Sequence, residues 1–271
     1  MSSGAVGQGA PGAPVARPLP ILGVSLKLYL DVAATGAWAG ELAELAARHP
    51  AVAGERVRLF ALPSLTALAQ TRQQLAGTPV AWGAQDLHWE DRGAFTGAVS
   101  GADLAELGCR YVEVGHAERK RIFGETPAVV GQKLNAAFRN GLTPVFCVGE
   151  QRAGTPELAA AECIAQLEDA FGHVTQLSAT SEIVVAYEPE WAIGRPVPAP
   201  AAHVRFVADR LRAWLGAHFA GAEASVIYGG SAQRGTLAEL GDSVDGLFLG
   251  RFAHRVSDLA AIVDEAAALA E

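Results

Sequence analysis

VVGQKLNAAFRNGLTPVFCVGE, residues 129–150, contains the unit that decides the fold. Its first part, VVGQKLNAAFRNG (129–141), places apolar residues three and four positions apart and ends in glycine, which predicts an amphipathic helix with a glycine stop. The run that follows, 143–148, is short and almost wholly apolar, which favours a strand covered on both faces. A helix followed by a buried strand is the repeating unit of an α/β protein.

The same alternation continues on both sides of this unit. Further amphipathic helices are indicated by AGELAELAARH (39–49), LTALAQTRQQLAG (65–77) and HVRFVADRLRAWLGAHF (203–219). Apolar runs predict strands near 21–25, 57–61, 79–83, 111–115, 143–148, 183–187, 225–228 and 246–249. Eight parallel strands suit closure, so we expect one TIM-type (β/α)8 barrel over residues 19–271. An open doubly wound sheet is the alternative. The absence of a GxGxxG motif after the first strand argues against that fold.

The composition argues against several classes of function. Half of the residues are hydrophobic, and the net charge of −8 argues against a nucleic-acid partner or an anionic membrane surface. No apolar run approaches the ~18 residues of a membrane-spanning helix. Cys109, Cys147 and Cys163 form no CxxC pair and no metal-like cluster with histidines, so we expect free thiols in the cytoplasm and no metal site. The Gly/Ala/Pro-rich residues 1–18 lack the features of a secretory signal and are expected to be a flexible tail.

Polar residues just past the strands form the candidate site, because strand ends converge on one face of a barrel. They are Ser25, Lys27, Gln85, His116, Glu118, Glu188, Gly229, Gly230, Ser231, Gly250 and Arg251.

Three of these side chains can carry chemistry. A carboxylate at Glu188, after a very apolar strand, is costly to bury unless it is functional or ion-paired. His116 lies at a predicted helix start, where the helix dipole disfavours protonation, so a neutral imidazole could donate to a substrate oxygen. Lys27 could stabilise an oxyanion. The structural alternatives are a salt-bridged glutamate, a hydrogen-bonded structural histidine and a lysine that reaches solvent.

Two glycine-containing turns predict a phosphate site. YGGS (228–231) and LGR (249–251) follow strands seven and eight, whose loops commonly bind phosphate in barrels. Glycine lets backbone N–H groups approach an anion closely. A Gly-Gly turn alone marks only an unusual dihedral, so it is the position after strand seven that favours binding.

Several longer strings resemble the triosephosphate isomerase family, in order and context, from about residue 21 to the C-terminus. They are WGAQDLHWEDRGAFTGAVS (82–100), YVEVGHAERKRIFGET (111–126), VFCVGE (145–150), AYEPEWAIG (186–194) and IYGGS (227–231). The resemblance implies aldose–ketose isomerisation through an enediol(ate) without metal or organic cofactor. In such a mechanism a glutamate base acts beside a neutral histidine electrophile.

The resemblance also implies residue roles. Glu188 would be the base, His116 the electrophile that shuttles hydroxyl protons, and Lys27 the stabilising charge, with Glu118 supporting them. Residues 189–194 would be a lid that excludes water, and Ser25 would lie beside the substrate. The phosphate would bind at Ser231, at the N–H groups around Gly194, Gly230 and Gly250, and at Arg251. The family forms homodimers, so the loop at 93–97 would enter a partner subunit, with Thr96 reaching the partner's site; a monomer with an exposed loop is the alternative.

Departures from the family pattern cluster around the substrate. The family's first-strand Asn is Ser25, the Ser after the catalytic His is Ala117, and the second Gly of the last phosphate turn is Arg251, which could bind phosphate or fill space. The lid also differs, at Glu190 and at 195–200. Because the base, the electrophile and the lysine are retained, the leading expectation is the isomerisation of dihydroxyacetone phosphate to glyceraldehyde 3-phosphate, with its place in glycolysis and gluconeogenesis. Alternatives are isomerisation of a four-carbon ketose phosphate, a non-catalytic phosphometabolite-binding barrel and, more weakly, a metal-dependent aldolase-type barrel.

Overall fold

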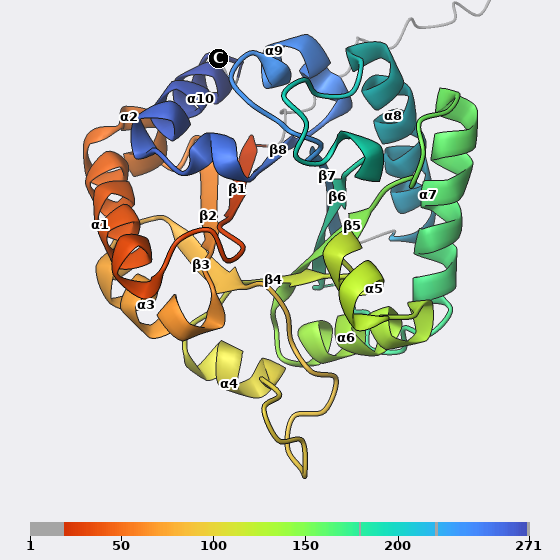
Figure 1. The fold of residues 1–271 in the computed structure, drawn as a ribbon, viewed down its shortest axis with the longest axis horizontal. Coiled ribbons are helices and arrows are strands. Elements are labelled where there is room, and N and C mark those ends of the chain that lie inside the picture. The colour runs from red at the N-terminus through yellow and green to blue at the C-terminus, as the bar shows by residue number, and fades with distance from the viewer. Residues whose placement is uncertain (1–18, 179, 220–221, 270–271) are drawn as a thin grey trace, which may run out of the picture.

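A computed structural model describes residues 19–178, 180–219 and 222–269, so the predicted tail at 1–18 lies outside the described residues. Eight parallel strands form a closed barrel in sequence order, with helices around it (Figure 1). The predicted TIM (β/α)8 barrel is confirmed, and the open doubly wound sheet is excluded. The strands are β1 Ile21–Ser25, β2 Arg58–Leu62, β3 Ala81–Ala84, β4 Tyr111–Val114, β5 Thr143–Val148, β6 Glu182–Tyr187, β7 Glu223–Tyr228 and β8 Gly246–Leu249.

β2, β3, β4, β6 and β7 differ from their predicted bounds by one or two residues, and two of these differences have a clear physical reason. β3 begins at Ala81 and not at 79, where Pro79 has no N–H to donate to a neighbouring strand. β7 begins two residues earlier than predicted, at Glu223, whose exposed side chain hides the strand from a search for apolar runs. Its pairing with Glu182 of β6 shows that backbone hydrogen bonding continues beyond the buried stretch.

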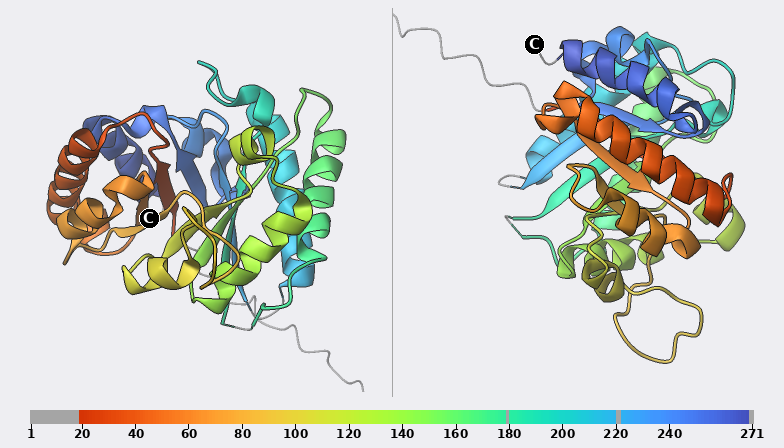
Figure 2. Two further views of the ribbon diagram at one scale, coloured as in Figure 1. Left: turned by 60° about the horizontal axis from the view of Figure 1, so that its bottom comes forward. Right: turned by 90° about the vertical axis from the view of Figure 1, so that its left-hand side faces the viewer.

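The helices form an outer ring around the barrel (Figure 1, Figure 2). They are α1 Val32–Arg48, α2 Pro50–Ala53, α3 Leu68–Leu75, α4 Gly101–Glu106, α5 Ala117–Phe123, α6 Pro127–Arg139, α7 Pro156–Phe171, α8 Ala201–His218, α9 Thr236–Leu240 and α10 Val256–Leu269. Short 3-10 turns η1 Leu65–Ala67, η2 Glu190–Ala192, η3 Gly241–Ser243 and η4 Arg251–Ala253 lie among them. None of the described helices is both long enough and apolar enough to span a bilayer.

The αβ unit at 129–150 shows how the sequence sets these elements. The Thr126 hydroxyl accepts a hydrogen bond from Val129 N at 3.3 Å, and Pro127 occupies the first turn of α6, as is usual at a helix start. The helix ends at Arg139, and Gly141 then adopts φ +68°, which lets the chain turn directly into β5.

Side chains alternate between two apolar layers. One layer fills the barrel and consists of Ile21, Phe60, Leu62, Tyr111, Val145, Cys147, Val184, Ala186, Ile227 and Phe248. The other lies between barrel and helices and includes Val112 and Val114, the neighbours of Glu113 on β4. Because side chains on a strand alternate, Glu113 lies on the barrel-facing side with Tyr111.

The loop from β3 to α4 projects from the molecule (Figure 1, Figure 2). Its residues 92–98 are all exposed, and they include Phe95, which keeps 41% of its surface accessible. The Phe95 ring lies 4.4 Å from that of His88.

Candidate active site

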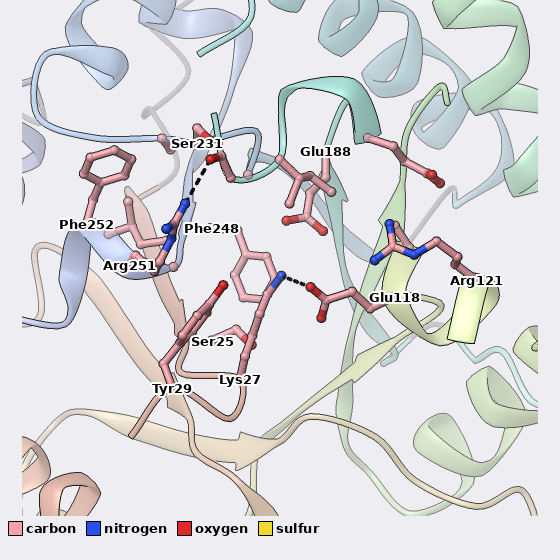
Figure 3. A pocket seen from close by; sticks show the side chains of 18 residues that line it. Ser25, Lys27, Tyr29, Glu118, Arg121, Glu188, Ser231, Phe248, Arg251 and Phe252 are labelled. Atoms are coloured by element: carbon pink, nitrogen blue, oxygen red, sulfur yellow. Dashed lines mark hydrogen bonds and ion pairs between the residues drawn. The ribbon is translucent and has the colours of Figure 1, made fainter. Parts of the chain in front are cut away.

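The structure brings most of the predicted site residues around two adjoining cavities at the C-terminal ends of the strands, and Figure 3 shows the first of them. The first, of about 260 Å³, is lined by Ser25, Lys27, Glu118, Glu188, Gly194, Ser231, Gly250 and Arg251, among others. The second, of about 560 Å³, shares Ser25, Lys27 and Glu118 and adds Gln85 and His116. Gly230 belongs to the turn beside the first cavity without lining it. Thr96 lies apart, exposed on the projecting loop.

Glu188 follows β6 and is 7% exposed. Its backbone N–H donates to Val148 O at 2.8 Å, which continues the strand pairing to the end of β5. Burial raises the pKa of the Glu188 carboxyl to about 7, although the positive charge of Lys27 acts in the opposite direction. A carboxyl that titrates near neutral pH can both take up and release a proton, as general acid–base catalysis requires.

His116 caps the start of α5 through its side chain. The N–H of Glu118 donates to Nδ1 at 3.1 Å, so Nδ1 carries no proton and Nε2 is the donor in the neutral ring. Nε2 lies 3.4 Å from Glu188 Oε2. Burial, together with the positive charges of Lys27, Lys120 and Arg121, lowers the pKa of His116 to about 3. The imidazole is therefore neutral and directs an N–H toward the cavity beside Glu188.

Lys27 is held between carboxylates. Its Nζ donates to Glu118 Oε1 at 2.9 Å, and Figure 3 shows this pair below Glu188. Burial lowers the pKa of Lys27, but the charges of Glu188 and Glu118 outweigh it, and the pKa is raised overall. The interpretation of Lys27 as a lysine that only reaches solvent is therefore wrong.

Strained backbone marks the same cavity. Among the described residues, three that are not glycine have positive φ, namely Lys27 (+50°), Glu55 (+52°) and Ser231 (+60°). Two of the three line the first cavity. Such conformations cost free energy and are found preferentially at functional sites.

The residues predicted to bind phosphate contact the lid backbone. Ser231 Oγ donates to Ala192 O at 2.8 Å, and Arg251 Nη2 donates to Gly194 O at 2.9 Å. Gly194 has φ +73°, in the left-handed region that favours glycine. Figure 3 shows Arg251 and Ser231 on the opposite side of the cavity from Arg121, with Glu188 between them.

A buried carboxylate anchors the lid to the barrel. Glu150 follows β5 and is 1% exposed. Trp191 Nε1 donates to its Oε1 at 2.7 Å, and His203 Nε2 lies 3.1 Å from the same oxygen. Tyr187 donates its hydroxyl to Oε2 at 3.1 Å. Three ring groups from the lid, β6 and α8 thus meet on one carboxylate.

Sequence reasoning missed some polar residues of the site, among them Arg121, which lines the first cavity, and Glu113, which lines the second. Glu190, which the sequence placed in the lid, also lines the first cavity. Ser25 Oγ donates to Glu113 Oε2 at 2.8 Å. The available signal for Glu113 was a lone acid between valines in an apolar strand, where a buried carboxylate requires a reason.

This geometry defines a class of protein. A barrel whose strand ends hold a buried carboxylate of raised pKa, a neutral imidazole and a fixed lysine around one cavity suits proton transfer next to a carbonyl. Across the described residues, no group of three or more His, Cys, Asp or Glu side chains is arranged to hold a metal ion. The class is that of isomerases of small carbonyl compounds.

Comparison with known proteins gives the family. A model of the triosephosphate isomerase family matches residues 20–266. An L-erythrulose-1-phosphate isomerase of Pectobacterium atrosepticum is 51% identical over 245 residues, which cover 90% of this chain and 95% of that protein. A triosephosphate isomerase of Moorella thermoacetica is 40% identical over 80% of this chain and 88% of its own, and one of a Synechococcus strain is 37% identical over 92% and 97%. The chain belongs to the triosephosphate isomerase family, and it is an enzyme of the aldose–ketose isomerase type that acts on a sugar phosphate.

Proposed function

We propose that this protein isomerises a four-carbon ketose phosphate, with L-erythrulose 1-phosphate as its substrate. One observation carries the proposal: identity to an L-erythrulose-1-phosphate isomerase is 51%, against 40% for a triosephosphate isomerase, and the match spans 95% of the former protein. This reverses the order expected from the sequence, in which the triose came first and the tetrulose was the alternative.

The proposed roles follow from the geometry. A ketose 1-phosphate of four carbons has its carbonyl at C2, a C–H bond at C3 and a hydroxymethyl group at C4. Glu188 takes the C3 proton, the C–H electron pair forms the C2–C3 double bond, and the C2 oxygen becomes an oxyanion. His116 Nε2–H and the Lys27 ammonium stabilise this oxyanion. Glu188 returns the proton to C2 while His116 moves the hydroxyl proton from O3 to O2. The carbonyl then lies at C3. The same proton transfer that interconverts a ketose and an aldose in a triose phosphate thus gives a second ketose when the chain has a fourth carbon.

The phosphate would bind on the other side of Glu188. Ser231, Arg251 and the backbone N–H groups near Gly194, Gly230 and Gly250 supply donors there. Ser231 and Arg251 already contact the lid backbone, so a phosphate that draws these side chains inward also moves the lid. Closure excludes water, which protects an enediolate phosphate from elimination.

The test compares L-erythrulose 1-phosphate with dihydroxyacetone phosphate, using one enzyme preparation and identical conditions. We expect kcat/KM to be higher for the four-carbon substrate. A preference for dihydroxyacetone phosphate would overturn the proposal. Glu188→Asp serves as the catalytic control: it withdraws the base by about one methylene and should lower kcat far more than it raises KM for either substrate.

Isomerisation of dihydroxyacetone phosphate to glyceraldehyde 3-phosphate is the second candidate, with the place in glycolysis and gluconeogenesis that it implies. Relatives named triosephosphate isomerase that match up to 92% of this chain favour it. The same comparison of substrates decides between the two. A non-catalytic binder would retain neither activity and needs no base such as Glu188.

We also propose a cytoplasmic homodimer joined through the loop at 93–97, with Thr96 reaching the partner's site. The exposed apolar Phe95 favours burial against a second subunit. Cys109, Cys147 and Cys163 are buried and unpaired, which suits a reducing compartment. Light scattering tests the dimer: the native chain should have twice the mass of one chain, and Phe95→Asp should have the mass of one. A native mass of one chain would refute the dimer.

A further inference from the structure

The Ser25–Glu113 hydrogen bond crosses the interior of the barrel. β1 and β4 are not neighbours in the barrel, so side chains from these strands meet only if both point inward. Ser25 is 3% exposed and Glu113 is 4% exposed, and the two residues are 88 positions apart in the sequence. The bond thus places a polar pair in the barrel interior, where Ser25 and Glu113 line the second cavity together with Lys27 and His116.

Glu113 has no cationic partner of its own. Among the described residues, its side chain forms one hydrogen bond, from Ser25, and no ion pair. Lys27, whose charge acts on Glu113 only from a distance, pairs with Glu118. Burial and the negative charge of Glu188 raise the pKa of Glu113 to about 8, so its carboxyl is mainly protonated at neutral pH. A neutral carboxyl beside a serine hydroxyl offers both a donor and an acceptor, which suits an uncharged hydroxyl ligand.

The position of this pair fits one end of the proposed substrate. Glu113 lines the second cavity, together with His116, and does not line the first, which contains the residues predicted to bind phosphate. Ser25 and Lys27 line both cavities and connect them. A ligand with its phosphate near Ser231 and its reacting carbons beside His116 therefore extends its far end toward Glu113.

The two candidate substrates differ at that far end. Dihydroxyacetone phosphate carries a hydrogen where L-erythrulose 1-phosphate carries the C4 hydroxymethyl group. The side chain of Ser25 is shorter than an asparagine side chain, which leaves room there, and Glu113 supplies a hydrogen-bonding partner. We propose that Glu113, held by Ser25, binds the C4 hydroxyl of the substrate and selects a four-carbon ketose phosphate over a triose phosphate. This inference rests on the proposed function.

Three variants test it, each measured for kcat and KM on L-erythrulose 1-phosphate and on dihydroxyacetone phosphate. Glu113→Leu removes the polar group and should lower the ratio of kcat/KM for the four-carbon to the three-carbon substrate at least about tenfold, because a site built to bind a hydroxyl discriminates through it. Glu113→Gln, which still donates and accepts, should keep the ratio within about threefold of the native value. Ser25→Ala frees the carboxyl and should lower the ratio in the same direction, and less than additively with Glu113→Leu.

The readouts separate a specificity role from a structural one. A structural role predicts equal losses on both substrates, and an unchanged ratio in Glu113→Leu would likewise overturn the inference. Inhibition by 2-phosphoglycolate, which has no hydroxymethyl group, should change by less than about threefold in Glu113→Gln and verifies that the site is intact. The native enzyme decides the proposed function separately: if it prefers the triose while Glu113→Leu still lowers the ratio, the proposed function fails and the specificity role of Glu113 stands.

Discussion

Gly229→Ala should inactivate the enzyme by displacing its base. A Cβ at Gly229 would lie 2.6 Å from Glu188 Cγ and 2.7 Å from Oε1. Ordinary van der Waals contact begins at 3.4 Å, which exceeds 2.6 Å by 0.8 Å, so the Glu188 side chain must shift by about 0.8 Å to restore ordinary contact. The Gly229 backbone cannot retreat freely, because its N–H donates to Tyr187 O at 2.9 Å.

This displacement moves the carboxyl group of Glu188, which transfers the proton. A misplacement near 1 Å can cost about 100-fold in rate, so we expect kcat to fall by about 100-fold. Overpacking of the site should also lower the free energy of unfolding by about 1–3 kcal/mol. Steady-state kinetics with the preferred substrate and urea unfolding measure the two effects.

Gly216→Ala is the matched control. Gly216 is exposed on α8, and a Cβ there would have no atom within 4 Å. Removing a glycine from a helix interior should raise the free energy of unfolding by about 0.5–1 kcal/mol without an effect on kcat. If Gly229→Ala kept kcat within about threefold of the native value, Glu188 in this position would not be the base.

Three shorter predictions concern charge in the site. kcat/KM should rise as pH passes about 7, because burial raises the pKa of Glu188 to about 7 and only the ionised carboxylate accepts a proton. His116 stays neutral in this range, because its pKa is about 3. A pH profile of kcat/KM that is flat from about pH 5.5 to 8 would contradict this prediction. Glu150→Ala should lower the free energy of unfolding in urea by about 3 kcal/mol, because Trp191 and two further ring donors lose their acceptor, and a loss below about 1 kcal/mol would argue against this anchor. Arg251→Gly should raise KM about tenfold for the sugar phosphate, since a charged donor beside the lid is removed, and an unchanged KM would exclude phosphate binding by Arg251.

The sign of the pH effect on stability is opposite to that on activity. The pKa of Glu188 is raised from an ordinary value of 4.5, so between pH 4.5 and about 7 the folded protein binds more protons than the unfolded chain. The contribution of Glu188 to the free energy of unfolding therefore falls as pH rises through this window. Activity and stability thus change in opposite directions as the same carboxyl ionises.

The barrel could be predicted from the sequence because strands buried on both faces leave apolar runs that are visible without a structure. β1, β5 and β8 were predicted with their observed bounds. One kind of error in the predicted strand bounds arises where a residue pairs in a strand although its side chain is exposed. Glu223 is the example. Pro79 is the reverse case, because a proline without an N–H stood inside a predicted strand.

A residue of the candidate site could be predicted from the sequence where its position just after a strand is enough to place it in the site. Glu188, His116 and Lys27 each lie within two residues of a strand end, so their convergence follows from barrel topology alone. Arg121 lies further along, on α5, and its direction depends on how that helix packs. A search of strand ends could not reach it.

The residues proposed to select the substrate were harder to predict from the sequence than the catalytic residues, and Glu113 shows why. In the sequence, Ser25 lacks the side-chain amide of the family's asparagine, and Glu113 is a lone acid in an apolar strand. Neither reading points to a ligand, since the partners are 88 positions apart and on strands that do not pair. Closure of the barrel joins them into one polar pair, which in the proposed binding mode lies where a triose has only hydrogen. If the base and electrophile are fixed by strand ends while specificity depends on such pairs, then Ser25→Asn with Glu113→Leu should shift preference toward dihydroxyacetone phosphate more than either change alone.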